Sequence, residues 1–154
     1  MSFSLSSAAF KEGERIAPKY TCKGQGISPP LRWENPPEYS ETFALIADAP
    51  DAPGGVFTHW VVFNLPASTY ELPAAIPAQE ALPGGALQGK NDFGRIGYGG
   101  PCPPPGPAPH YRFTLYALDK ALDLKAGARR EDVVDMMQGH ILAQAQLTGT
   151  YKRQ

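Results

Sequence analysis

The sequence of 154 residues has a formal net charge of −1, with acidic and basic residues interspersed along it. This length is enough for one domain, residues 1–154, that buries a core without metals or several disulfides. The charge excludes the basic surface of a protein that binds nucleic acid or anionic membranes, and 42% hydrophobic residues beside 17 prolines and 16 glycines indicate an ordered, loop-rich domain.

Taken in chain order, the predicted elements are mostly strands. The segment "FSLSSAAF" (3–10) has a weak strand pattern, and 42–48 is a short apolar run. Residues 56–66 are rich in β-branched and aromatic side chains, and 111–119 and 140–151 alternate apolar and polar residues with a period of two.

The strongest helix prediction covers residues 129–138, where Val133, Met136 and Met137 form one apolar stripe and Gly139 follows. Such a stripe indicates packing against a core rather than a binding surface. The predicted fold class is therefore mainly β: an antiparallel β-sandwich with one or two short peripheral helices.

Residues 89–112 form the longest interruption of this pattern, and 12 of these 24 residues are glycine or proline. Long loops inside compact domains are uncommon and often functional. Prolines stiffen the path of the chain and glycines permit close approach. We expect a rigid wall here, with a flexible loop as the alternative.

Two cysteines, Cys22 and Cys102, are too few for a disulfide scaffold and lack zinc-site spacing. Buried thiols are the favoured interpretation, and a single disulfide that closes a long loop is the alternative. The N-terminus lacks the pattern of a signal peptide, and no apolar run approaches the roughly 18 residues of a membrane span. We therefore expect a cytoplasmic protein without a membrane span.

The sequence contains no G-x-S-x-G, H-E-x-x-H or Walker-type motif, and its histidines His59, His110 and His140 lack metal-ligand spacing. We therefore expect no metal, no cofactor and no catalytic residue, and the chain is not predicted to be an enzyme.

His59 lies in the predicted strand 56–66, shortly after the turn "DAPDAP" (48–53). A histidine in such a strand is most often a core residue with satisfied hydrogen bonds. Alternatively, its ring faces a pocket and binds an anion, because imidazole becomes a cationic donor near neutral pH. Asp48 and Asp51 either orient that ring, bind a ligand's cation, or bond to amides of their own turn.

In this combination of motifs the sequence resembles the phosphatidylethanolamine-binding protein (PEBP) family, most closely its bacterial and archaeal branch of Raf kinase inhibitor-like proteins. The matching segments in chain order are "YTCKGQGISPPLRW" (20–33), "DAPDAPGGVFTHWVVFNLP" (48–66), "PGGALQGKNDFGRIGYGGPCPPPGP" (83–107), "YRFTLYALD" (111–119) and "GHILAQAQLTGTYKR" (139–153).

The resemblance implies a Greek-key-like sandwich with a small surface pocket for phosphate or phosphorylated head groups. The positions that match the family's ligand-binding motifs are Asp51, His59, Gly100, Pro101, Pro103 and Tyr111. His110 joins this predicted set, because a one-residue adjustment of its loop would bring it to the pocket.

Two positions depart from the family pattern. Ala49 stands where the family's D-P-D-A-P turn has its first acid. Pro109 stands where the H-R-Y segment has its histidine, so that His110 takes the arginine position. Both changes remove a polar group from the expected pocket and bear on its ligand preference.

The predicted function is a non-catalytic PEBP-family module that binds a phospholipid head group or small anion and regulates or inhibits a partner protein, a kinase or a serine protease. One alternative is a small phosphoester or ester hydrolase that uses His59 as acid–base and Asp51 as its orienter. Another is a structural interaction protein with a vestigial pocket. The resemblance also implies a homodimer, and no nucleic-acid partner is expected.

Overall fold

The computed structural model describes residues 2–52 and 55–152, and within them eight strands form two antiparallel sheets. The strands are β1 (Ser4–Ser6), β2 (Leu31–Glu34), β3 (Thr42–Ala49), β4 (Phe57–Pro66), β5 (Glu71–Leu72), β6 (Leu87–Gln88), β7 (His110–Leu118) and β8 (Ile141–Thr150). The helical elements are α1 (Arg130–Met137) and two short 3-10 helices, η1 (Pro18–Tyr20) and η2 (Pro83–Gly85).

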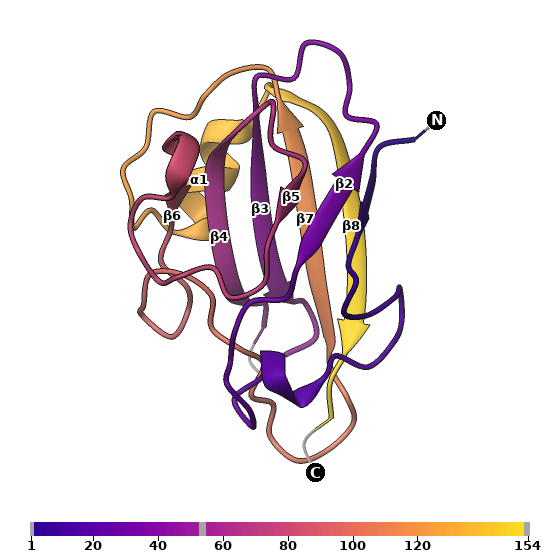
Figure 1. Ribbon diagram of the computed structural model, residues 1–154. Helices are drawn as coiled ribbons and strands as arrows, with labels where there is room; N and C mark the ends of the chain where they lie inside the picture. Colours follow the sequence, from indigo (N-terminus) through magenta and orange to yellow (C-terminus); the bar gives the residue numbers. More distant parts are fainter. Residues whose placement is uncertain (1, 53–54, 153–154) are drawn as a thin grey trace.

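The two sheets and the helix form three layers (Figure 1). The larger sheet has the strand order β6-β4-β3-β7-β8 and the smaller sheet the order β1-β2-β5. The small sheet covers one face of the large sheet, and α1 packs against the opposite face. All of β3 is buried, because this central strand is covered on both faces.

Alternation along β3 sends its side chains into two separate cores. Phe43, Leu45 and Ala47 belong to the core between the two sheets, whereas Ala44 and Ile46 belong to the core beneath α1. A strand buried on both faces reads as a continuous apolar run, which is the pattern of residues 42–47.

The helix α1 confirms the predicted apolar stripe. Val133 and Met137 are fully buried against the large sheet, and Met136 is half-buried. No Ser, Thr, Asn or Asp precedes the helix; instead a carboxylate oxygen of Asp132 accepts a hydrogen bond from the backbone N–H of Arg129 at 3.0 Å. This contact satisfies one backbone donor of the first turn.

The prediction of a mainly β antiparallel sandwich is confirmed. The four segments with the clearest pattern correspond to β3, β4, β7 and β8, each within one residue at either end. The strands β2, β5 and β6 were not predicted, because strands of two to four residues offer too few positions to show a period of two.

The favoured interpretation of the cysteines is wrong. Cys22 and Cys102 are exposed and form a disulfide with a Cα–Cα distance of 5.3 Å, across a separation of 80 residues. Spacing along the chain carries no information on whether two distant cysteines meet in space. Within the described ranges, no helix is long and apolar enough to cross a membrane.

Candidate ligand-binding site

A cavity of about 230 Å³ opens at one end of the sandwich, where β3 ends and β7 begins. Long loops gather at this end of the molecule (Figure 1). The lining residues come from the ends of three strands and from two loops: Ala49, Ala52, Phe57, His59, Phe93, Cys102, Pro103, Pro104, Pro109 and Tyr111.

A β-bulge in β4 turns His59 toward this cavity. Ala47 of β3 pairs with Trp60, and the next residue, Asp48, pairs with Thr58, so His59 has no opposite partner. Regular alternation would place His59 and Trp60 on opposite faces of the sheet. With the bulge, His59 lines the cavity while Trp60 lies in the core between the sheets.

The imidazole ring of His59 is held by a reciprocal contact with Gly99. Its Nδ1 lies 2.8 Å from the carbonyl oxygen of Gly99, and the N–H of Gly99 donates to the carbonyl of His59 at 2.8 Å. A carbonyl only accepts, so Nδ1 carries a proton and donates it. Nε2 is therefore the ring nitrogen that remains for a ligand.

Burial controls the charge of His59, which is 6% exposed. Desolvation lowers the pKa of His59 from its usual 6.5, although the Gly99 carbonyl and the charges of Asp48 and Asp92 oppose this effect. The imidazole is therefore neutral at neutral pH in the protein without ligand, with Nε2 as a hydrogen-bond acceptor.

Aromatic rings surround His59 and make the cavity largely apolar. Their centroids lie 4.9 Å away for Phe57, 5.7 Å for Phe93 and 5.3 Å for Tyr111. Burial, with a smaller contribution from Asp51, raises the pKa of Tyr111 to about 12. The Tyr111 hydroxyl therefore keeps its proton at physiological pH and is a possible hydrogen-bond donor.

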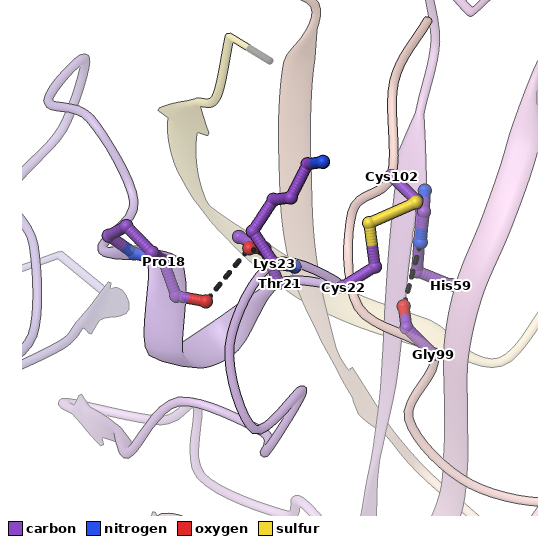
Figure 2. The surroundings of a disulfide bond; sticks show 7 residues. All are labelled: Pro18, Thr21, Cys22, Lys23, His59, Gly99 and Cys102. Atoms are coloured by element: carbon purple, nitrogen blue, oxygen red, sulfur yellow. Dashed lines mark hydrogen bonds between the residues drawn. A yellow bond between two sulfur atoms is a disulfide. The ribbon is translucent and has the colours of Figure 1, made fainter. Parts of the chain in front are cut away.

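The opposite side of the cavity is formed by the proline wall, residues 101–109. Cys102 ties this wall to the loop after η1 through the disulfide with Cys22, close to His59 and Gly99 (Figure 2). In the described part of the chain we find no hydrogen bond to the backbone of residues 102–109. The wall is therefore held mainly at its two ends.

The second end of the wall is held by Asp51. One carboxylate oxygen accepts a hydrogen bond from the backbone N–H of His110 at 3.0 Å, and the other lies 2.9 Å from Nδ1 of the same residue. The hydrogen bond from the His110 side chain is the main cause that lowers the pKa of Asp51. About half of each side chain is exposed, 48% for Asp51 and 58% for His110.

Asp48 lies on the other face of the sheet and does not contact the cavity with its carboxylate. It accepts two hydrogen bonds from Arg112, at 3.0 and 3.1 Å, and Nε of Arg130 lies 3.7 Å away. The Asp48 side chain is 5% exposed. Its pairing raises the pKa of Arg112 and leaves Asp48 unavailable to orient His59 or to hold a ligand's cation.

Nothing around the cavity is arranged as a metal site. Within residues 2–52 and 55–152, no three His, Cys, Asp or Glu side chains gather closely enough to hold a metal ion. The chemistry offered by the cavity is hydrogen bonding by His59 and Tyr111 within an apolar enclosure.

The sequence model of the phosphatidylethanolamine-binding protein family matches residues 6–152, nearly the whole of the described chain. The chain belongs to this family. Similar proteins, both named UPF0098 protein, are found in Methanothermobacter thermautotrophicus (50% identical, covering 97% of this chain and 98% of the relative) and Aquifex aeolicus (52%, covering 96% and 86%).

Two solved PEBP structures share the fold. A phosphatidylethanolamine-binding protein homolog from Chlamydia trachomatis is 38% identical with a TM-score of 0.90, over 99% of both chains. YbcL of E. coli, described as a new member of the mammalian PEBP family, is 34% identical with a TM-score of 0.92, over the full length of both chains.

The residues predicted from the PEBP motifs fall into three groups. His59, Pro103 and Tyr111 line the cavity together. Asp51 and His110 pair beside it without lining it. Gly100 and Pro101 lie outside the lining.

Gly100 and Pro101 lie against η1 and the loop that follows it. A Cβ on Gly100 would lie 3.0 Å from the backbone of Tyr20 and Thr21, so this close approach requires glycine. Pro101 is buried, and its carbonyl accepts a hydrogen bond from the N–H of Cys22 at 3.1 Å.

Five lining residues were not predicted: Ala52, Phe57, Phe93, Cys102 and Pro104, whereas Ala49 and Pro109 were named only as departures from the family pattern. Phe57 begins the strand that carries His59, and its place could have been read from the alternation after the turn. Phe93 comes from the glycine-rich loop, where the sequence has no periodic pattern that would indicate its direction.

Proposed function

We propose that this PEBP-family protein is a non-catalytic binding protein whose cavity takes a small molecule with an oxyanion, such as a phosphate ester. The arrangement of His59 supports the proposal. Its Nδ1 is fixed on the Gly99 carbonyl, and protonation makes Nε2 a second, charged donor inside the cavity. The Tyr111 hydroxyl, protonated at physiological pH, is a further donor.

The composition of the lining supports a binding rather than a catalytic role. Apart from His59 and Tyr111 its residues are Ala, Phe, Pro and the disulfide-bonded Cys102. In the part of the lining that the structure describes, no serine, threonine or free thiol accompanies the imidazole as a nucleophile. The hydrolase hypothesis therefore has one acid–base group and no nucleophile among the residues that line the cavity.

A titration with inorganic phosphate tests the proposal. We expect the ring resonances of His59 to shift with saturation and the affinity to fall at least tenfold in His59→Ala, because the variant loses the charged donor. His140→Ala is the matched control, since that exposed imidazole lies at the opposite end of the large sheet and pairs with Asp119. Phosphate affinity that is equal in wild type and His59→Ala overturns the proposal.

The pH dependence gives a second signature of the same site. Because burial lowers the pKa of His59 and a bound oxyanion raises it again, binding takes up a proton. Affinity for sulfate, which does not titrate near neutrality, should be highest at low pH and fall as the pH rises between these two pKa values. Calorimetry in buffers of different ionisation enthalpy measures the proton uptake. If no proton is taken up on binding at pH 7, His59 is not charged in the complex.

We extend the proposal to regulation of a partner protein, a kinase or a serine protease, as the family resemblance implies. Phe93 lines the cavity and is 44% exposed, so the surface around the opening presents an apolar group to a partner. Inhibition assays against kinases and serine proteases, with and without phosphate, test this role. A homodimer is a further part of the proposal, tested by analytical ultracentrifugation.

A cytoplasmic location is also proposed. The disulfide makes this location testable, because the redox state of the two cysteines depends on the compartment. Exposed disulfides persist in oxidising compartments and are rare in the cytosol outside hyperthermophiles. Thiol labelling of Cys22 and Cys102 in fresh extracts, combined with cell fractionation, tests the location. Recovery of the oxidised protein outside the cytoplasmic fraction contradicts it.

A further inference from the structure

Among the described residues that line the cavity, none carries a carboxylate that would pair with a positively charged ligand group. Three acids lie nearby, and each is engaged elsewhere: Asp48 pairs with Arg112 across the sheet, Asp51 pairs with His110, and Asp92 accepts the backbone N–H of Thr58 at 2.8 Å. The described lining residues include none of the three. A ligand ammonium placed here would lose its hydration without a counter-charge.

Ala49 contributes an uncharged methyl group to the cavity, beside His59 and Tyr111. Ala49 is 2% exposed and lies at the end of β3, where it pairs with Phe57 and lines the cavity. A longer polar side chain at this position would reach the space beside the His59 ring, whereas a methyl group leaves that space apolar. The proline wall and Phe93 continue the apolar surface around the opening.

The aromatic rings are packed on one another rather than spread around an empty centre. Phe57 and Phe93 meet edge to face at 4.8 Å, and each also contacts the imidazole. Such a surface suits a compact apolar group. A volume of about 230 Å³ is sufficient for an aromatic ring with a small anionic substituent, since an apolar cavity of about 150 Å³ holds benzene.

We propose that the cavity selects an oxyanion attached directly to a compact apolar group, such as an aryl or short-alkyl phosphate, and discriminates against zwitterionic head groups such as phosphoethanolamine. This inference rests on the proposed function, because His59 must hold the oxyanion. It adds the ligand class: the apolar group lies against Phe57, Phe93 and the proline wall, and no part of the ligand carries a positive charge.

Calorimetric titration at pH 6 with phenyl phosphate, inorganic phosphate, phosphoethanolamine and phosphocholine tests the selectivity. We expect phenyl phosphate to bind at least tenfold more tightly than phosphoethanolamine. Equal or tighter binding of phosphoethanolamine overturns the inference and leaves the proposed function intact. Tighter binding of phosphocholine also overturns it, because the rings then act as a cage for a cation. Binding of none of the four overturns the proposed function and this inference with it.

Two variants test which residues cause the preference for phenyl phosphate over phosphoethanolamine. Ala49→Asp should lower phenyl phosphate affinity at least tenfold and narrow or reverse the preference over phosphoethanolamine, whereas Ala121→Asp, on an exposed loop residue, should change neither. Because Ala49 is buried, Phe93→Ser provides a second variant at a partly exposed position. It should weaken phenyl phosphate severalfold and weaken inorganic phosphate less, because only phenyl phosphate carries a group that packs on this ring. Unchanged phenyl phosphate affinity in a folded Phe93→Ser protein contradicts the placement of the apolar group.

Discussion

At the scale of single residues, His59 combines two properties that usually exclude one another. It is buried as deeply as a core residue, and yet it lines a cavity. Both follow from the contact with Gly99, which satisfies Nδ1 through the protein and leaves Nε2 for a ligand. The two interpretations that the sequence allowed, a satisfied core histidine and a ligand-binding histidine, therefore describe different nitrogens of one ring.

The same burial predicts a pH-dependent stability. The pKa of His59 is lower in the folded protein than the 6.5 of an exposed imidazole, so the unfolded chain binds the proton more tightly. This contribution to the free energy of unfolding is complete above about pH 6.5 and is lost as the pH falls toward the folded-state pKa. Urea unfolding of wild type and His59→Gln between pH 5 and 8 measures it. We expect a smaller loss at acidic pH in the variant, and identical pH profiles contradict the assignment.

The residues of the site differ in how far the sequence could place them. His59 and Tyr111 were predicted because strand alternation and motif order fix their elements. The direction of Asp51 could not be predicted, because it depends on where His110 meets the turn in space. The motif predicted Asp51 as a ligand-binding residue, and in the structure this residue clamps the start of β7 and is not among the residues that line the cavity.

At the scale of elements, Asp48 connects three of them. Its carboxylate joins β3 to Arg112 of β7 and to Arg130 of α1. A buried carboxylate with two hydrogen bonds from a guanidinium stabilises the fold more than an exposed ion pair does.

Asp48→Ala should therefore lower the free energy of unfolding by about 2 kcal/mol, because it leaves the partly buried arginines without their acceptor. Asp119→Ala is the matched control: it removes the exposed pair with His140 and should cost about 0.5 kcal/mol or less. Urea unfolding compares the two. Asp119→Ala should keep wild-type phosphate affinity, whereas Asp48→Ala should weaken phosphate binding, because the Asp48 charge raises the pKa of His59. Equal losses of stability contradict the role of Asp48.

The proline wall is the element that the sequence predicted least completely. Its composition indicated stiffness, and the lack of backbone hydrogen bonds along residues 102–109 agrees with a segment in which proline supplies few donors. The disulfide and the Asp51–His110 pair hold the wall in place. Both are contacts between residues far apart in the sequence. No local pattern reports such contacts.

At the scale of the whole molecule, the disulfide is the strongest single link between distant parts of the chain. It joins the loop after η1 to the proline wall, and the 80-residue separation encloses β2 to β6. Closing so long a loop restricts the unfolded chain and thereby stabilises the folded one.

Replacing both cysteines by serine should lower the free energy of unfolding by about 4 kcal/mol. It should also weaken phosphate binding, because the wall then loses its covalent attachment to the loop after η1. Urea unfolding and phosphate titration of the Cys22→Ser/Cys102→Ser protein measure both effects. Wild type with a dithiol reductant should behave in the same way. A loss below 1 kcal/mol shows that the folded chain does not depend on this link.

Because of the bulge at His59, the cavity depends on the number of residues in β4 as well as on their identity. If one codon between Phe57 and Trp60 were deleted, β4 could pair with β3 without this bulge, and only the register shift between Phe43 and Leu45 of β3 would remain. Both hydrophobic cores would keep their residues, but the imidazole would be lost or would face α1 beside Asp48. In the evolution of this chain, a single in-frame deletion would thus remove the site and keep the fold.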